Sequence, residues 1–335
     1  MASPAQAITL EEHAIFPSLE SNNFFYDNTW KIYPECRNLA KDLSKTRLAN
    51  MDAGNVSYQI LSHLPGGVAS TDPARCYAAN NEMATAIKQH PDRFGGFAAL
   101  PMAHPLEAAK ELRRTVTDLG FLGALIDNHL PDGTTHYDDE RFWPVFAAAE
   151  SLDVPLYIHP STPSQDSIQT RFSGNYPLAA ELGLASGAWG WHENVGLHIL
   201  KLYAAGVFEQ YPKLKIVIGH MGELLPIMLH RIARLGFFKG LAASRRKGIM
   251  DVWNENIWVT TSGVFSVETL MMLLQVTKVE RKTPPWSHGT SMLDIDDRYP
   301  RLLCLLSLDC TPLYDYILGK HSQGTTTEEQ IDLFE

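Results

Sequence analysis

Several short apolar runs of the sequence end in acidic or histidine side chains, the residue types that hold metal ions and transfer protons. Glu11 and His13 close the first such run, ITLEEH. His159 closes PLYIH, and His220 follows KIVIG, with Glu223 three residues later. Imidazole nitrogens and carboxylate oxygens that converge on one point form a mixed site for a single divalent ion with open positions. The pattern therefore predicts a metal centre that also supports acid–base chemistry.

A structural interpretation competes with this one at each position. A single histidine near a strand end is often no more than a hydrogen-bonded structural residue. The segment GHMGE at 219–223 also fits a tight turn. Three strand ends that each carry ligand-type residues favour the functional interpretation. Residues i and i+2 of a strand share one face, so we expect Glu11 and His13 to point together and Glu12 to face away.

The apolar runs that precede these side chains have the character of buried strands. They are continuous rather than alternating, as expected for strands covered on both faces. We predict eight strands, at 8–13, 57–63, 94–101, 121–128, 155–160, 215–222, 257–263 and 302–309. Amphipathic helical patterns lie between them, at 74–90, 105–119, 139–152 and 191–210.

Regular alternation of strand and helix indicates a parallel sheet, and eight such units in 335 residues predict an α/β fold, a (β/α)8 barrel, as one domain spanning 1–335. No Gly-rich loop follows the first strand, which disfavours a dinucleotide-binding fold. The Ser-, Gly- and Thr-rich segment 161–188 follows the fifth strand, where barrels place functional loops. Residues 282–301 show no periodicity, and we expect an irregular insertion there, before the eighth strand.

The composition excludes several function classes. The net charge is −10 and no cluster of Lys and Arg occurs, which disfavours a nucleic-acid partner. No apolar run approaches the roughly 18 residues of a membrane span, and the first six residues do not resemble a signal peptide. The four cysteines form no CxxC pair, as is usual in a reducing compartment. We therefore expect a cytoplasmic protein without nucleic-acid or membrane partners.

In six segments the sequence resembles the amidohydrolase superfamily, and within it the metal-dependent aromatic decarboxylases. This branch includes 2,3-dihydroxybenzoate, γ-resorcylate and aminocarboxymuconate-semialdehyde decarboxylases. The segments extend over most of the chain and are LEEHAI, HPDRFGGFAALP, GFLGALIDN, LDVPLYIHP, GVFEQYPKLKIVIGHMGELLP and ENIWVTTSG. GHMGE together with YIHP and LEEH is a specific combination, whereas each part alone is weak.

The resemblance implies one divalent metal ion, Zn²⁺ or Mn²⁺, with Mg²⁺ as a further candidate. Glu11, His159 and an aspartate at the end of the eighth strand are expected to hold it. His13 is a ligand in some members of the family and a near neighbour of the ion in others. We also expect the chain to form a homodimer or homotetramer.

The resemblance implies that His220 either faces the substrate or lies just behind the metal ligands, with Glu223 and Arg231 as its support. We predict catalytic roles for His220 and Glu223. We also expect Phe25, Arg231 and Ser262 to contact a small aromatic carboxylic acid substrate, although aromatic residues such as Phe25 are core or interface residues at least as often.

Two aspartates compete for the role at the eighth strand. Asp309 follows an apolar run, whereas Asp296 lies in LDIDDRYP, a composition typical of a solvated loop. The sequence departs from the family pattern here, because residues 282–301 intervene and Cys310 and Thr311 stand where an aromatic residue and proline are expected. We predict that Asp309 is both a metal ligand and a proton donor.

These assignments predict a non-oxidative decarboxylase of the ortho-hydroxybenzoate type, which releases carbon dioxide. The ring carbon that bears the carboxylate must be protonated, and the developing phenolate must be stabilised. Two alternatives stay open. The same metal could activate a water for hydrolysis of a small cyclic or amide substrate, or the disturbed region 282–310 could mark an inactive family member.

Overall fold

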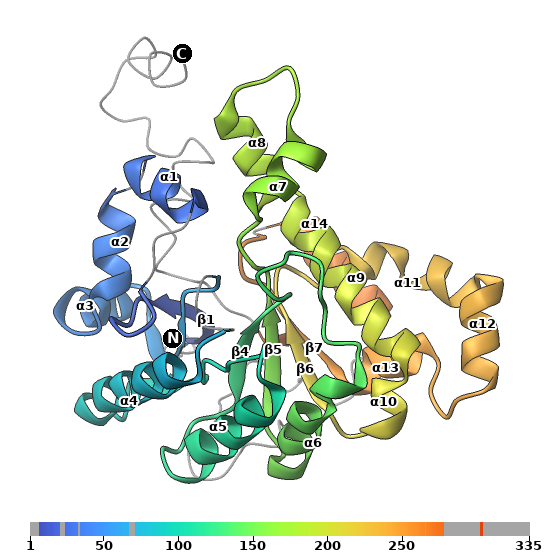
Figure 1. The fold of residues 1–335 in the computed structure, drawn as a ribbon, viewed down its shortest axis with the longest axis horizontal. Coiled ribbons are helices and arrows are strands. Elements are labelled where there is room, and N and C mark those ends of the chain that lie inside the picture. The colour runs from blue at the N-terminus through green and yellow to red at the C-terminus, as the bar shows by residue number, and fades with distance from the viewer. Residues whose placement is uncertain are drawn as a thin grey trace, which may run out of the picture.

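The computed structural model describes residues 7–20, 24–32, 34–66, 71–264, 266–277 and 302–303. Its strands run parallel and follow one another in chain order (Figure 1): β1 (Ala7–Ala14), β2 (Val56–His63), β3 (Phe94–Gly96), β4 (Ala124–Asp127), β5 (Pro155–His159), β6 (Lys215–Ile218), β7 (Ile257–Thr260) and β8 (Leu302–Leu303). The strands form two sheets, β1–β3 and β4–β8, and a parallel bridge between Ala98 and Ala124 joins them. Within the described residues, no strand pairing joins β8 to β1.

Helices follow the strands along the chain and cover their outer face (Figure 1). The alternation confirms the predicted α/β class and is that of a (β/α)8 barrel. The α-helices are α1 (Phe24–Ile32), α2 (Pro34–Lys41), α3 (Lys45–Ala53), α4 (Pro73–Gln89), α5 (Pro105–Thr117), α6 (Trp143–Leu152), α7 (Gln165–Ser167), α8 (Leu178–Ala185), α9 (Gly190–Ala205), α10 (Val207–Gln210), α11 (Leu225–Arg234), α12 (Gly236–Ala243), α13 (Ile249–Glu255) and α14 (Val267–Val276). Two short segments, Glu140–Phe142 and Ile168–Phe172, are 3₁₀ and π turns.

Local sequence signals explain where several of these elements begin. The side chain of Asp72 accepts hydrogen bonds from the backbone N–H groups of Ala74 and Arg75, and Pro73 occupies the first turn of α4. A capping side chain and an early proline are the usual start of a helix. The segment 161–188, predicted as a loop, instead contains α7, the π turn and α8.

The interior of the barrel is filled by one large apolar side chain from each of seven strands or strand ends. These are Leu10, Ile60, Phe97, Leu125, Tyr157, Val217 and Trp258. A second and larger core lies between the strands and the helices. Because inward and outward residues alternate along a strand, the inner set fixes which later residues face the mouth of the barrel.

The predicted eighth strand is described only at Leu302–Leu303, which pairs parallel with Val259 and Thr260 of β7. Asp296, Asp309 and the predicted insertion 282–301 lie outside the described residues. Within the part of the chain that the structure describes, no helix is both long and apolar enough to cross a membrane.

Candidate active site

Glu11 and His13 reach the mouth of the barrel through an irregularity in β1. Leu10 belongs to the inner core, so strict alternation would turn Glu11 outward. The pairing of β1 with β2 shifts register between Thr9 and Glu12, a β-bulge that re-aims the following side chains. Glu12 then faces the helices, where its carboxylate lies 3.8 Å from the guanidinium of Arg47.

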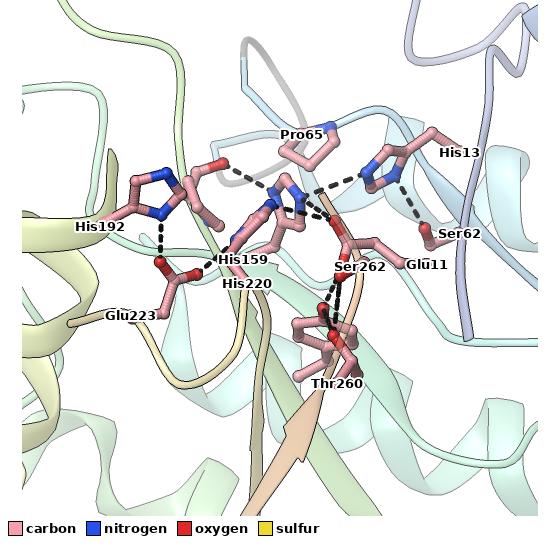
Figure 2. Close-up of polar contacts among 12 residues, drawn as sticks. Glu11, His13, Ser62, Pro65, His159, His192, His220, Glu223, Thr260 and Ser262 are labelled. Carbon is pink, nitrogen blue, oxygen red and sulfur yellow. Dashed lines mark hydrogen bonds and ion pairs between the residues drawn. The ribbon is translucent and has the colours of Figure 1, made fainter. Parts of the chain in front are cut away.

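Glu11 meets two histidines from other strands at this mouth. Its Oε1 lies 3.3 Å from Nε2 of His159, at the end of β5, and 3.4 Å from Nε2 of His220, after β6. Figure 2 shows the three side chains converging on one point. Each offers one ligand atom, and these atoms all lie within 4.8 Å of one another.

The backbone holds His159 in the tautomer that a metal ligand needs. Its Nδ1 donates a hydrogen bond to the carbonyl oxygen of Pro160, at 2.8 Å, so the lone pair of Nε2 points into the cluster. Nε2 of His13 lies 3.2 Å from this same nitrogen, while its Nδ1 contacts Ser62 at 3.1 Å. His13 therefore stands at the edge of the same cluster.

Hydroxyl groups occupy the other carboxylate oxygen of Glu11. The hydroxyls of Tyr157 and Ser262 donate hydrogen bonds to Oε2, and Thr260 Oγ1 lies 3.4 Å from it. Gly219 fits closely against this group, because a Cβ there would lie 2.9 Å from the Tyr157 hydroxyl. Oε2 is thus held by the protein, while Oε1 faces the two histidines.

His220 and Glu223 form a buried pair on a strained turn. Nδ1 of His220 donates to Oε1 of Glu223 at 2.7 Å, and the Glu223 side chain is fully buried. All five residues from His220 to Leu224 have positive φ, between 50° and 91°. Left-handed backbone is costly for residues other than glycine, and such strain concentrates at functional sites. The strain turns Glu223 back under His220.

The charges of the site follow from these contacts. Burial disfavours a charged His220, but the carboxylates of Glu223 and Glu11 outweigh it and raise the pKa of His220 to about 9. Burial opposes ionisation of Glu223, yet the charge of His220 and the hydrogen bond from His192 lower its pKa to about 2. Burial likewise opposes ionisation of Glu11, but His220 and His159 hold the pKa of Glu11 well below its ordinary value. Burial and the nearby His159 lower the pKa of His13 to about 3.

This donor set fits a divalent cation. It combines an ionised carboxylate with imidazole nitrogens, the ligands that Zn²⁺ and Mn²⁺ accept. The bond from His159 to Pro160 and the hydroxyls on Glu11 supply the outer partners that orient ligands in metal sites. Glu11 and His159 are therefore positioned as the predicted ligands, with His13 beside them.

The predicted substrate-contacting residues occupy three different environments. Phe25, on α1, is buried and packs on Trp191 with ring centroids 6.0 Å apart, and Trp191 in turn lies 6.4 Å from the His159 ring. Ser262 is buried against Glu11. Arg231 is exposed on α11.

Sequence reasoning missed two residues that the structure places in the site. Tyr157 precedes His159 by two, so strand alternation alone could have placed its hydroxyl on the same face. His192 lies in the first turn of α9 and contacts Glu223 at 2.7 Å. No apolar run precedes it, so the search at strand ends did not detect it.

Comparisons with known proteins agree with this geometry. The amidohydrolase family model matches residues 44–288. The decarboxylase orsB of Emericella nidulans is 44% identical over 282 residues, which cover 82% of this chain and 82% of that protein. The γ-resorcylate decarboxylase of Rhodococcus jostii is 38% identical over 287 residues, 80% of this chain and 83% of the relative.

Among solved structures, the chain is similar to a dihydroxybenzoic acid decarboxylase from Polaromonas, crystallised with manganese and the inhibitor 2-nitroresorcinol. The TM-score is 0.72 at 27% identity, over 95% of this chain and 92% of that one. The chain therefore belongs to the amidohydrolase family, as the sequence segments indicated. All three of these similar proteins are named as decarboxylases.

Proposed function

We propose that this chain is a metal-dependent, non-oxidative decarboxylase of a hydroxylated aromatic acid. The observation that carries the proposal is the convergence of Glu11 and His159 on one point, with the His220–Glu223 pair directly beside them. A cation site next to a buried proton-holding histidine suits a reaction that binds an anion and protonates carbon. The named decarboxylases among its relatives support the same reaction class.

Glu11 and His159 would hold the metal, with the predicted Asp309 completing the set. When bound, a divalent ion supplies a template for the substrate carboxylate and ortho-oxygen and stabilises the developing phenolate. The manganese in the Polaromonas structure supports a divalent ion. We infer Mn²⁺ or Zn²⁺ for this chain, and metal analysis after purification tests which of them binds.

His220 is suited to hold the proton of the reaction. With its pKa raised to about 9 it is protonated at neutral pH, and its Nε2 faces the mouth of the barrel beside Glu11. In the reaction the ring carbon that bears the carboxylate gains a proton, the bond to that carboxylate breaks, and its electron pair restores the aromatic ring. Carbon dioxide leaves, and no oxidant or reductant is consumed. Asp309 stays the predicted direct donor, with His220 orienting the proton.

A hollow lined by Trp191, whose ring centroid lies 6.4 Å from that of His159, is a suitable place for the aromatic ring. It is lined by side chains that include Asn128, Ser161, Arg171 and Trp191. Trp191 and the nearby Phe25 offer faces for stacking, while the amide and guanidinium groups offer hydrogen bonds to ring oxygens. The aromatic faces and hydrogen-bonding groups around the hollow therefore suit an ortho-hydroxybenzoate.

The test is incubation of the metal-loaded protein with a panel of ortho-hydroxybenzoates, following carbon dioxide. We expect one carbon dioxide and one phenol for each acid consumed. Hydrolysis of cyclic or amide compounds without carbon dioxide release would favour the hydrolase alternative. Protein that binds the metal fully but turns over neither class would be an inactive family member.

The homodimer or homotetramer and the cytoplasmic location stay predictions. Exposed apolar side chains on α11, α12 and α14 support self-association: Ile227 is 67% exposed, Phe237 70% and Val267 71%. Where such side chains form one contiguous patch, they often mark an interface. We expect the Phe237→Glu variant to have a lower molar mass by light scattering than the wild-type assembly.

A further inference from the structure

The imidazole of His192 contacts the pair formed by His220 and Glu223, here called the catalytic pair, from the side away from Glu11. His192 lies in the first turn of α9, and its side chain is 13% exposed. Its Nδ1 lies 2.7 Å from Oε2 of Glu223 and its Nε2 lies 2.8 Å from the carbonyl oxygen of Gly187. Figure 2 shows the Glu223 carboxylate between the two histidine rings.

Each oxygen of Glu223 is therefore assigned to one imidazole. Oε1 accepts from His220 and Oε2 accepts from His192, both at 2.7 Å. A fully buried carboxylate is stable only when hydrogen bonds replace its lost water, and charged acceptors make the strongest of these bonds. Loss of the His192 bond would leave Oε2 unpaired and free the side chain to rotate away from His220.

The main chain fixes the orientation of the His192 ring. The carbonyl oxygen of Gly187 and the carboxylate of Glu223 can both only accept, so the two contacts together require Nε2–H and Nδ1–H on one protonated ring. A ring rotated by 180° would place carbon atoms against both oxygens. His192 thus connects the catalytic pair to the segment between α8 and α9, next to Trp191.

Judged by distance alone, a metal ion could also bind between His192, His220 and Glu223. The hydrogen bonds argue against that use, because both carboxylate oxygens already accept from imidazole nitrogens. The contact geometry instead suits a support for His220.

We propose that His192 is a positioning residue: it holds Glu223, and through Glu223 it sets the direction in which His220 presents Nε2 to the substrate. The inference rests on the proposed decarboxylase function. Among the residues that the structure describes, His192 contacts neither Glu11 nor His159, and it does not line the hollow next to Trp191. Its removal should therefore lower turnover without removing the metal.

Two nearly isosteric variants separate the two hydrogen bonds. The side-chain amide of asparagine places its nitrogen where Nδ1 lies, whereas that of glutamine reaches the place of Nε2. His192→Asn therefore keeps the bond to Glu223, and His192→Gln keeps only the bond to Gly187. We expect kcat to fall about 10- to 100-fold in His192→Gln and His192→Ala, the range typical of outer-shell changes, and to stay within about threefold in His192→Asn.

In all three variants we expect KM and metal content to match the wild type. Leu197→Ala, at an exposed position of the same helix, is the control for changes in α9 and should leave kcat unchanged. Equal loss of kcat in the Asn and Gln variants, unchanged kcat in His192→Ala, or loss of metal in any variant would overturn the assignment.

A second readout does not depend on turnover. In protein labelled with ¹⁵N-histidine, the ring-nitrogen signals of His220 report its bond to Glu223. These signals should match the wild type in His192→Asn and shift in His192→Gln, and matching signals in His192→Gln would contradict the proposal. If the wild-type protein releases no carbon dioxide from any acid, the proposed function fails. The NMR comparison still tests whether His192 positions Glu223 and His220.

Discussion

His220 lies among carboxylates at the mouth of the barrel, whereas His198, on α9, lies among amide groups. Both nitrogens of His220 face Glu223 and Glu11, at 2.7 and 3.4 Å. Nδ1 of His198 donates to the side-chain carbonyl of Asn128 at 2.9 Å, and its Nε2 accepts from the backbone N–H of Tyr137 at 3.1 Å. The carboxylates raise the pKa of His220 to about 9, while burial lowers that of His198 well below its ordinary value.

Burial disfavours the charged form of both rings, so the comparison shows that the carboxylate partners of His220 are what allow it to hold a proton. Both rings are buried, but one can hold a proton at neutral pH and the other is fixed as a neutral tautomer. A neighbour of His198 shows the same effect, because burial lowers the pKa of His136, whose Nε2 donates to Asn194 at 2.6 Å. The amide-rich group serves packing, and the acid-rich group is suited to catalysis.

The largest expected effect is loss of metal. It should occur when a histidine of the acid-rich group is replaced and not when one of the amide-rich group is. His159→Ala removes an imidazole ligand, so we expect metal to be lost and turnover to fall by more than about 100-fold, beyond the range of outer-shell changes. His198→Ala is the matched control: it should lower the unfolding midpoint but keep the metal. Metal analysis of both variants after dialysis checks this, and full occupancy in His159→Ala would remove it from the ligand set.

Asp309→Asn and Asp296→Asn test the predicted eighth-strand ligand. We expect Asp309→Asn to lose both metal affinity and turnover, because it removes a ligand charge and the predicted proton donor. Asp296→Asn should behave as wild type. The reverse order of effects, measured by metal titration and carbon dioxide release, would assign the role to Asp296.

A smaller effect is expected from the hydroxyls that hold Glu11. Tyr157→Phe and Ser262→Ala each remove one donor to Oε2, and we expect metal affinity to fall about tenfold in either variant. Calorimetric titration of the metal measures this directly. Val217→Ala, which changes another inner-core side chain without removing a polar group, is the control for altered packing. Wild-type affinity in both hydroxyl variants would mean that Glu11 needs no such support.

The smallest expected effect is on the pH dependence of the free energy of unfolding. The folded chain keeps His198 neutral, while the unfolded chain binds a proton there near the ordinary value of 6.5. Below pH 6.5 the unfolded state therefore binds more protons, and stability falls with falling pH by at most about 1.4 kcal/mol per unit for each such histidine. Urea unfolding between pH 5 and 7 should show a shallower slope in His198→Asn than in wild type. Identical slopes would show that His198 does not contribute.

Much of this arrangement could be predicted from the sequence, because strand ends meet at one mouth of a barrel. The alternation rule that paired Glu11 with His13 also applies to Tyr157 with His159 and to Thr260 with Ser262. The fold and the main ligand candidates followed from apolar runs and the residues that close them.

The remaining contacts depend on backbone features that local sequence does not favour. A register shift in β1 turns Glu11 inward, and five successive residues with positive φ, from His220 to Leu224, bring Glu223 under His220. Left-handed backbone of this length has no local propensity, so only tertiary packing selects it. The contact between His192 and Glu223 depends on that turn and could not be inferred from spacing.

The most direct test of the account is the reaction of the manganese-loaded protein with 2,6-dihydroxybenzoate in heavy water, followed by NMR and mass spectrometry. If the ring carbon is protonated from the site as carbon dioxide leaves, the phenol product carries one deuterium at the carbon that lost the carboxylate. Glu223→Gln, at equal metal content, should form the same product much more slowly. Absence of carbon dioxide release by the metal-loaded wild type, or equal rates in wild type and Glu223→Gln, would contradict the account.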